Sequence, residues 1–242
     1  MATAAAVRRL EGHSGRINAA AFGGADGDVV FTASYDQTVK AWDLRSHSRV
    51  PVQTLDAHRD SVTSVDVGPH AVLTGCVDGS CRAFDLRAGR LHTDARGGPV
   101  TSARFYAGAK GAPAKAYVAV CTDGRAVLVD AASGAALQTY AGAHEHRGGY
   151  ALEACAAFDG EHVLCGSEDG SVAAYAVVGK GKGQGQGQGR AGKAPDHRLA
   201  GGHRPGSAVS GISPHPDAGK FLTSGHDGEC VLWERAVGSL AY

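Results

Sequence analysis

Residues with the chemistry of a hydrolase lie within the first forty positions: His13, Ser34 and Asp36. In serine hydrolases an aspartate orients a histidine, which takes the proton of an attacking serine hydroxyl. The chain contains no Gly-x-Ser-x-Gly turn, which many of these enzymes use to expose the serine. Similar residue sets also recur, with losses, farther along the chain. We therefore interpret the set as structural, and the sequence predicts no catalytic residue and no enzyme.

The spacing of other candidate residues disfavours metal and cofactor sites. The chain has 12 histidines, but His144 and His146 are too close together for the helical zinc motif, whose histidines lie four residues apart. Residues 187–192 match the Gly-x-Gly-x-x-Gly pattern of dinucleotide-binding loops, yet no strand leads into them and Pro195 follows. No phosphate-binding loop or paired carboxylates stand out. We expect no cofactor, no metal and no small-molecule ligand.

The cysteines and the chain start bear on the cellular compartment. None of the six cysteines forms a Cys-x-x-Cys pair, and most lie in apolar runs, which favours buried, reduced thiols. No stretch has the 18 or more consecutive apolar residues of a membrane span. The first ten residues lack a hydrophobic region long enough for a secretory signal. We expect a cytoplasmic or nuclear protein, or both.

Composition narrows the class of partner. The 242 residues include 24 Lys and Arg and 24 Asp and Glu, so no net charge steers the chain towards nucleic acid or an anionic membrane. Hydrophobic residues make up 43%, which is enough for a sizeable core. The 36 glycines are about twice the usual share, which indicates many turns, a linker, or both.

Five segments of the chain repeat one pattern. Each has an apolar run, a short stretch of small residues ending in aspartate, and an aromatic or apolar residue six positions later. The pairs are Asp36 and Trp42, Asp78 and Phe84, Asp123 and Val129, Asp169 and Tyr175, and Asp227 and Trp233. Successive aspartates are 42, 45, 46 and 58 residues apart. The first three spacings fit the repeat of a four-stranded propeller blade.

Local signals agree with blades of antiparallel strands. Glycine follows the aspartate at Asp78, Asp169 and Asp227, which predicts tight hairpins, and residues 61–67 alternate as in a half-buried strand. We therefore predict an all-β propeller that forms one domain over residues 1–242. Its repeats are predicted at about 8–45, 53–89, 96–133, 140–178 and 199–235.

The repeats resemble the WD-repeat family, whose blades carry Gly-His and, later, Trp-Asp. Gly-His or Ala-His occurs at His13, His58, His144 and His203, and Trp42 precedes an aspartate. The resemblance implies a buried hydrogen-bonded set of this histidine, the hairpin aspartate, a hydroxyl two residues before it and the tryptophan. Its members here are His13, Ser34, Asp36, Trp42, His58, Asp78, Asp123, His144, Ser167, Asp169, His203 and Asp227.

Within that family, residues 51–65, 73–79, 84–91 and 167–172 are similar to the mitogen-activated protein kinase organizers, which are small WD-repeat scaffolds. Members of that group have seven repeats, and this chain aligns with the last five. Two alternatives stay open: a seven-blade propeller that lacks its first two blades, or a divergent five-repeat form. In the second case, residues 3–10 could add a strand to the last blade.

A glycine-rich segment separates the fourth and fifth repeats. Residues 179–195 alternate glycine with lysine and glutamine, and they account for the longer final spacing. Such a composition can bury nothing, which predicts a flexible, exposed loop inserted between two strands. Its positive charges could touch RNA or a phosphoprotein weakly, but a solvated linker is the simpler interpretation.

The resemblance implies a protein-binding platform. WD blades bind partners through the residue before each hairpin aspartate and through residues that enter the first strand. The corresponding positions are Arg16, Asn18, Tyr35, Ser61, Thr63, Thr101, Thr122, Glu168 and His226. Arg16 and Tyr35 are the sharpest candidates because arginine and tyrosine are favoured interface anchors.

Three functions fit such a platform: a signalling scaffold for a MAP kinase cascade, a spliceosome subunit that acts in mRNA splicing, or a generic adaptor such as a ubiquitin-ligase substrate receptor. The implied partners are other proteins, either kinase-cascade or spliceosomal components. The sequence implies no direct nucleic-acid binding and no membrane partner.

Overall fold

The computed structural model describes residues 6–24, 26–106, 116–140, 150–157, 160–177, 195–215 and 219–234. His144 and residues 179–194 of the glycine-rich segment lie outside this described part, so the expectations for them stay predictions. The described residues form 19 strands and no helix. The predicted all-β propeller architecture is confirmed, with five blades.

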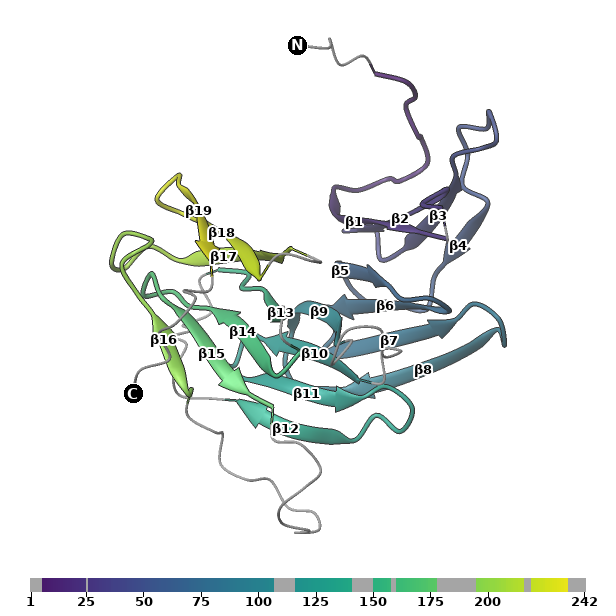
Figure 1. Ribbon diagram of the computed structural model, residues 1–242. Helices are drawn as coiled ribbons and strands as arrows, with labels where there is room; N and C mark the ends of the chain where they lie inside the picture. Colours follow the sequence, from purple (N-terminus) through teal and green to yellow (C-terminus); the bar gives the residue numbers. More distant parts are fainter. Residues whose placement is uncertain are drawn as a thin grey trace.

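Each blade is one antiparallel sheet (Figure 1). Blade 1 contains β1 (Ile17–Gly23), β2 (Val29–Ser34), β3 (Val39–Asp43) and β4 (Gln53–Leu55). Blade 2 contains β5 (Val62–Val67), β6 (Ala71–Cys76), β7 (Ser80–Asp85) and β8 (Arg90–Ala95). Blade 3 contains β9 (Val100–Tyr106), β10 (Ala116–Cys121), β11 (Ala126–Asp130) and β12 (Ala136–Tyr140). Blade 4 contains β13 (Ala154–Ala156), β14 (His162–Gly166), β15 (Val172–Ala176) and β16 (His197–Leu199). Blade 5 contains β17 (Val209–Pro214), β18 (Lys220–Gly225) and β19 (Cys230–Glu234).

The fourth strand of a blade lies beyond the sequence repeat that supplies the other three. β4 pairs with β3, for example, although its residues begin the second sequence repeat. β8, β12 and β16 likewise follow the repeat that supplies the first three strands of their sheet, and each pairs with the third strand of that sheet. The structural blade and the sequence repeat are therefore offset by about one strand.

The hairpin between the second and third strands follows the aspartate of each repeat. Four of these turns have glycine after the aspartate, as at Gly79, whose φ is 81°. Only glycine reaches this left-handed region without steric conflict with a Cβ atom. In blade 1 the same position is Gln37, with a φ of 68°. Blade 1 therefore carries backbone strain that the glycines avoid in the other blades.

The core consists of layers between successive blades. We call the side of a blade that faces the next blade in sequence its forward face, and the opposite side its backward face. The forward face holds the residues five and three positions before the hairpin aspartate and three and five positions after it. In blade 1 these are Phe31, Ala33, Val39 and Ala41, and they pack against Val62, Val65, Val72 and Phe84 on the backward face of blade 2. Three equivalent clusters join blades 2 and 3, 3 and 4, and 4 and 5.

The ring of blades is open between blade 5 and blade 1. The first strands lie in succession, β1 beside β5, then β9, β13 and β17. In the described part of the chain, β17–β19 do not pack against β1–β4, and Figure 1 shows the opening between them.

The N-terminal segment follows blade 1 rather than closing the ring. The Arg8 guanidinium donates to the Leu44 carbonyl at 3.2 Å, and the Glu11 amide donates to the Arg49 carbonyl at 3.0 Å. Both acceptors lie between β3 and β4. Among the described residues, β17–β19 therefore gain no fourth strand from residues 6–10, in contrast to the second alternative above.

Candidate protein-binding face

A polar network fixes the β2–β3 turn of blade 1. Asp36 Oδ2 lies 2.8 Å from His13 Nδ1 and accepts a 2.9 Å hydrogen bond from the Ser14 amide. Asp36 Oδ1 accepts a 2.6 Å hydrogen bond from the Thr38 hydroxyl. Burial raises the pKa of Asp36, but hydrogen bonds from Thr38, His13 and Ser14 outweigh it and hold the pKa well below its usual range. The ionised carboxyl thus ties the His13 turn to the hairpin.

Thr32 links this turn to the buried indole of blade 1. Its Oγ1 lies 2.7 Å from His13 Nε2 and accepts the indole N–H of Trp42 at 2.8 Å. The two ring nitrogens of His13 thus contact Asp36 on one side and Thr32 on the other. These contacts hold the His13 turn, β2 and β3 together.

Ser34, the hydroxyl expected in this set, makes different contacts. It donates to the Arg16 carbonyl at 3.0 Å and accepts from the Asp36 amide at 3.1 Å. Because side chains alternate along a strand, Ser34 and Thr32 share one face of β2, but only Thr32 contacts both His13 and Trp42. The bridging hydroxyl is therefore four residues before the aspartate, not two. Ser167 resembles Ser34, since it also accepts from the amide of its own hairpin aspartate.

Blade 5 repeats the arrangement of blade 1. His203 Nδ1 lies 3.1 Å from Asp227 Oδ2, and His203 Nε2 lies 2.7 Å from Thr223 Oγ1. Thr223 accepts the indole N–H of Trp233 at 2.8 Å. A backbone hydrogen bond from Arg204 is the main reason that the pKa of Asp227 falls to about 2.

Blade 2 replaces the histidine–aspartate contact with an arginine. Arg82 Nη2 lies 2.7 Å from Asp78 Oδ2, and both side chains are almost buried. His58 still reaches Thr74 Oγ1 at 2.9 Å, but its Nδ1 is buried without a hydrogen-bond partner. Burial, together with the nearby Arg82 cation, lowers the pKa of His58 to about 4. His58 is therefore neutral in the folded chain at neutral pH.

In blades 3 and 4 the hairpin aspartates make the following contacts with other described residues. The carboxyl of Asp123 pairs with Arg125 at the surface, with the Arg125 Nε 2.7 Å from Asp123 Oδ2. Asp169 accepts from the Ser171 hydroxyl at 2.6 Å and pairs with Arg198 of β16. In both blades the aspartate thus caps its own hairpin.

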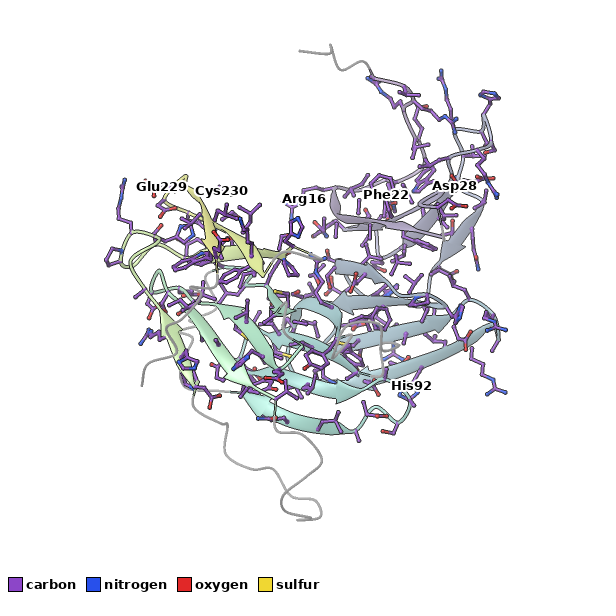
Figure 2. All side chains as sticks on the ribbon, viewed as in Figure 1. Arg16, Phe22, Asp28, His92, Glu229 and Cys230 are labelled. Carbon is purple, nitrogen blue, oxygen red and sulfur yellow. The ribbon has the colours of Figure 1, made fainter. Side chains whose placement is uncertain are left out.

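The exposed residues of blade 1 lie at the end where the hairpin meets the first strand. The Tyr35 amide donates to the Arg16 carbonyl at 2.9 Å, so the two residues lie opposite each other in the backbone, and the Arg16 Nε donates to Asn18 Oδ1 at 3.1 Å. Tyr35 is 65% exposed and Arg16 is exposed too. Figure 2 shows Arg16 at the end of blade 1 nearest the opening of the ring. An aromatic and a cationic side chain are therefore both accessible to a partner at this end of blade 1.

Other candidate binding residues are engaged inside the molecule. Asn18 Nδ2 donates to Ser61 Oγ at 3.0 Å and to the Val62 carbonyl at 2.8 Å, and Ser61 is buried. Thr63 Oγ1 donates to the Val100 carbonyl at 2.8 Å, and Thr101 Oγ1 donates to the Leu152 carbonyl at 2.9 Å. In each case a side chain of one first strand bonds to the next blade. We therefore leave these four residues out of the proposed face.

Two of the remaining candidates make the same backbone hydrogen bond as Tyr35. The Thr122 amide donates to the Pro99 carbonyl and the His226 amide to the Ala208 carbonyl, each at 2.9 Å. Thr122 and Glu168 are half-buried, whereas His226 is exposed. The His226 ring packs on Tyr150, with 4.2 Å between ring centroids. Tyr150 is a surface aromatic that the sequence analysis missed, because it lies outside the repeated positions.

Comparison with known proteins agrees with these blades. The model of the family "WD domain, G-beta repeat" matches residues 5–43, 49–85 and 196–234. The chain is a WD40 repeat protein. It is 28% identical to the WD repeat domain-containing protein 83 homolog of Dictyostelium discoideum, over 87% of this chain and 66% of that protein.

Two further relatives match shorter stretches. WD repeat domain-containing protein 83 of Rattus norvegicus is 36% identical over 53% of this chain and 38% of its own length. The guanine nucleotide-binding protein subunit beta of Arabidopsis thaliana is 33% identical over 39% of this chain and 27% of its own length. This WD40 protein thus spans at most about two thirds of these relatives.

The matched segments of this WD40 protein are the blades in which a histidine contacts a threonine. Thr32, Thr74 and Thr223 occupy the position four residues before the aspartate in blades 1, 2 and 5. In blades 3 and 4 that position is Ala119 and Cys165. The loss of the buried hydroxyl therefore accompanies the loss of the family pattern.

The described residues add two observations about the WD40 chain. They contain no group of three or more His, Cys, Asp or Glu side chains placed to hold a metal ion. They also contain no helix with the length and apolar character needed to cross a bilayer. WD40 propellers are generally non-catalytic scaffolds that bind other proteins.

Proposed function

We propose that the chain is a non-enzymatic protein–protein interaction scaffold that assembles components of a MAP kinase cascade. The observation that carries the scaffold function is the exposed pair of Arg16 and Tyr35, which stands beside a hairpin fixed by the Asp36 network. A rigid turn presents these side chains at little entropic penalty, and tyrosine and arginine are common hot-spot residues.

The kinase assignment rests on resemblance. The more specific part of the similarity to the kinase organizers is residues 51–91, which span β4–β7 and the start of β8. The similarity to WD repeat domain-containing protein 83 of Dictyostelium discoideum extends over most of the chain. Both favour the organizer type over a generic adaptor such as a ubiquitin-ligase substrate receptor.

Affinity purification with mass spectrometry tests this proposal. Wild type, the double variant Arg16→Ala with Tyr35→Ala, and the control Leu137→Ala are expressed with the same tag. Leu137 is exposed on β12, the outer strand of blade 3, away from the proposed face. We expect kinase-cascade proteins with wild type and with the control, and a loss of about tenfold or more with the double variant, as for a hot-spot residue.

Other outcomes would change the assignment. Spliceosomal proteins that co-purify in an RNase-sensitive nuclear fraction would favour mRNA splicing, and a cullin adaptor would favour a ubiquitin-ligase receptor. Unchanged recovery of every partner in the double variant would show that partners bind elsewhere on the molecule.

A further inference from the structure

A hollow of about 240 Å³ lies where the β6–β7 hairpin of blade 2 meets the connection from β8 into blade 3. Residues 77–79 of the hairpin form one side, and Ala95 with residues 97–99 forms the other. Val77 precedes the hairpin aspartate of blade 2, as Tyr35 does in blade 1. The hollow therefore lies at the same end of the blades as the proposed binding face.

Two glycines in the turn into blade 3 leave this space open. Gly97 and Gly98 stand three and two residues before β9, and Arg59 and Asp60 stand at the same places before β5. The turn into blade 2 thus carries two exposed side chains where the turn into blade 3 carries none. A Cβ atom at Gly98 would have no neighbour closer than 3.7 Å, so there is room beside its backbone.

The backbone of this turn also offers free hydrogen-bond donors. In blades 1 and 2 the residue three places before the first strand is Ser14 or Arg59, and its amide donates to the hairpin aspartate. In blade 3 the amides of Gly97 and Gly98 donate to no acceptor in the described part of the chain. Backbone N–H groups are strong donors that are rarely buried without an acceptor, so a partner that covers them must supply one.

The charges around the hollow are already balanced. Asp78, in its wall, pairs with Arg82 at 2.7 Å. Asp123, the side chain nearest to a Cβ atom at Gly98, pairs with Arg125, whose Nε lies 2.7 Å from Asp123 Oδ2. An anion in the hollow would meet both carboxylates, and a cation would meet two carboxylates that already have a partner. The lining is therefore complementary to uncharged groups.

We propose that the hollow binds one small, uncharged side chain of an extended partner segment, while a main-chain carbonyl of that segment accepts a hydrogen bond from the Gly97 amide. A volume of about 240 Å³ suits one alanine, valine or proline side chain, and it is below the size of drug-like ligand pockets, about 300–1,000 Å³. Main-chain hydrogen bonds combined with side-chain pockets are a general way to bind extended peptides. The inference rests on the proposed scaffold function, because it names the chemistry of the partner at the same end of the blades.

Selection from a library of short random peptides tests the proposal on the full 242-residue chain. Wild type is the bait, and Gly98→Leu is the variant that fills the hollow. Gly98 has a negative φ and precedes a proline, where extended backbone suits any residue, so the fold is retained, which circular dichroism checks. Ala88→Leu, an exposed change between β7 and β8 at the other end of blade 2, is the control. We expect enriched peptides to share one alanine, valine or proline, and to bind Gly98→Leu about tenfold or more weakly than wild type or the control.

Variants of the peptide and of the face complete the test. Replacing the shared residue of the peptide with aspartate should abolish binding, and Gly98→Ala should weaken binding less than Gly98→Leu does. If Gly98→Leu weakens binding but Arg16→Ala with Tyr35→Ala does not, the hollow is a binding site and the proposed anchor residues are wrong. If the double variant weakens binding but Gly98→Leu binds like wild type, the scaffold face stands and the hollow proposal is overturned. A selection that enriches no peptide, or peptides whose shared residue is charged, would overturn it as well.

Discussion

Replacing Thr32 with valine tests the structural interpretation of the blade 1 network. Valine has the shape of threonine but no hydroxyl, so the indole N–H of Trp42 and the Nε2 of His13 both lose their partner. Trp42 is 2% exposed, and water cannot replace the lost contact. A buried polar group left unpaired costs about 1–3 kcal/mol, and two groups lose their partner here, so Thr32→Val should destabilise blade 1 by about 2–6 kcal/mol.

Blade 2 provides an internal comparison for this magnitude. Thr74 contacts His58 in the same way, but Phe84 has no N–H to donate to it. Thr74→Val therefore leaves one side-chain group unpaired instead of two, and should destabilise its blade by about 1–3 kcal/mol. The difference between the two variants isolates the contribution of the indole N–H.

Hydrogen–deuterium exchange measures each blade separately, because amides exchange through local as well as global opening. The amides of β2 and β3 report on Thr32→Val, and those of β6 and β7 on Thr74→Val. Thr93→Val, at an exposed position of β8, serves as the control. If Thr32→Val exchanged no faster than the control, the network would not stabilise the blade and our interpretation of it would be wrong.

Three further predictions concern stability. Burial lowers the pKa of His58 from 6.5 to about 4, so the contribution of neutral His58 to folding stability is complete above about pH 6.5 and is lost as the pH falls towards 4. The melting temperature of His58→Gln should therefore fall less than that of wild type between about pH 7 and pH 5. An equal fall in both proteins would contradict this assignment. In Gly166→Ala the added Cβ atom would overlap the Val209 carbonyl oxygen of blade 5, so the free energy of unfolding measured in urea should fall by more than about 2 kcal/mol. The added Cβ atom of Gly98→Ala has room, so that variant should unfold like wild type. Gln37→Gly relieves a left-handed backbone and should stabilise the chain by up to about 1 kcal/mol in the same assay; a less stable variant would show that Gln37 carries no net strain.

The fold could be predicted because its signals are local. The hairpin aspartate lies in the turn and the residue six positions later lies in the third strand, and this offset is the same in every blade regardless of the rest of the sequence. Period-two alternation then assigns each residue to a forward or a backward face. The same alternation explains the error at Ser34, since residues two and four positions before Asp36 share one face and only the distance to His13 separates them.

The binding face could be predicted only in part, because the first strands contain β-bulges. The pairing of β1 with β2 shifts between Ile17 and Ala19, and that of β5 with β6 between Val62 and Ser64. The bulged residues are Asn18 and Thr63, whose side chains contact the next blade. A bulge redirects a side chain without any clear mark in the sequence. Side chains that simple alternation assigns to the surface therefore form hydrogen bonds between blades instead.

The offset between blade and sequence repeat affects how the chain behaves when it is cut. A single cleavage between β3 and β4, within residues 44–52, leaves β4 covalently attached to blade 2 but hydrogen-bonded to β3 of blade 1. The two fragments would therefore stay together through a β-sheet as well as through the apolar layer between the blades. The same holds at each later junction that has a fourth strand. Such a chain is suited to fragment complementation, in which separately expressed halves reassemble through the strand that one half lends to the other.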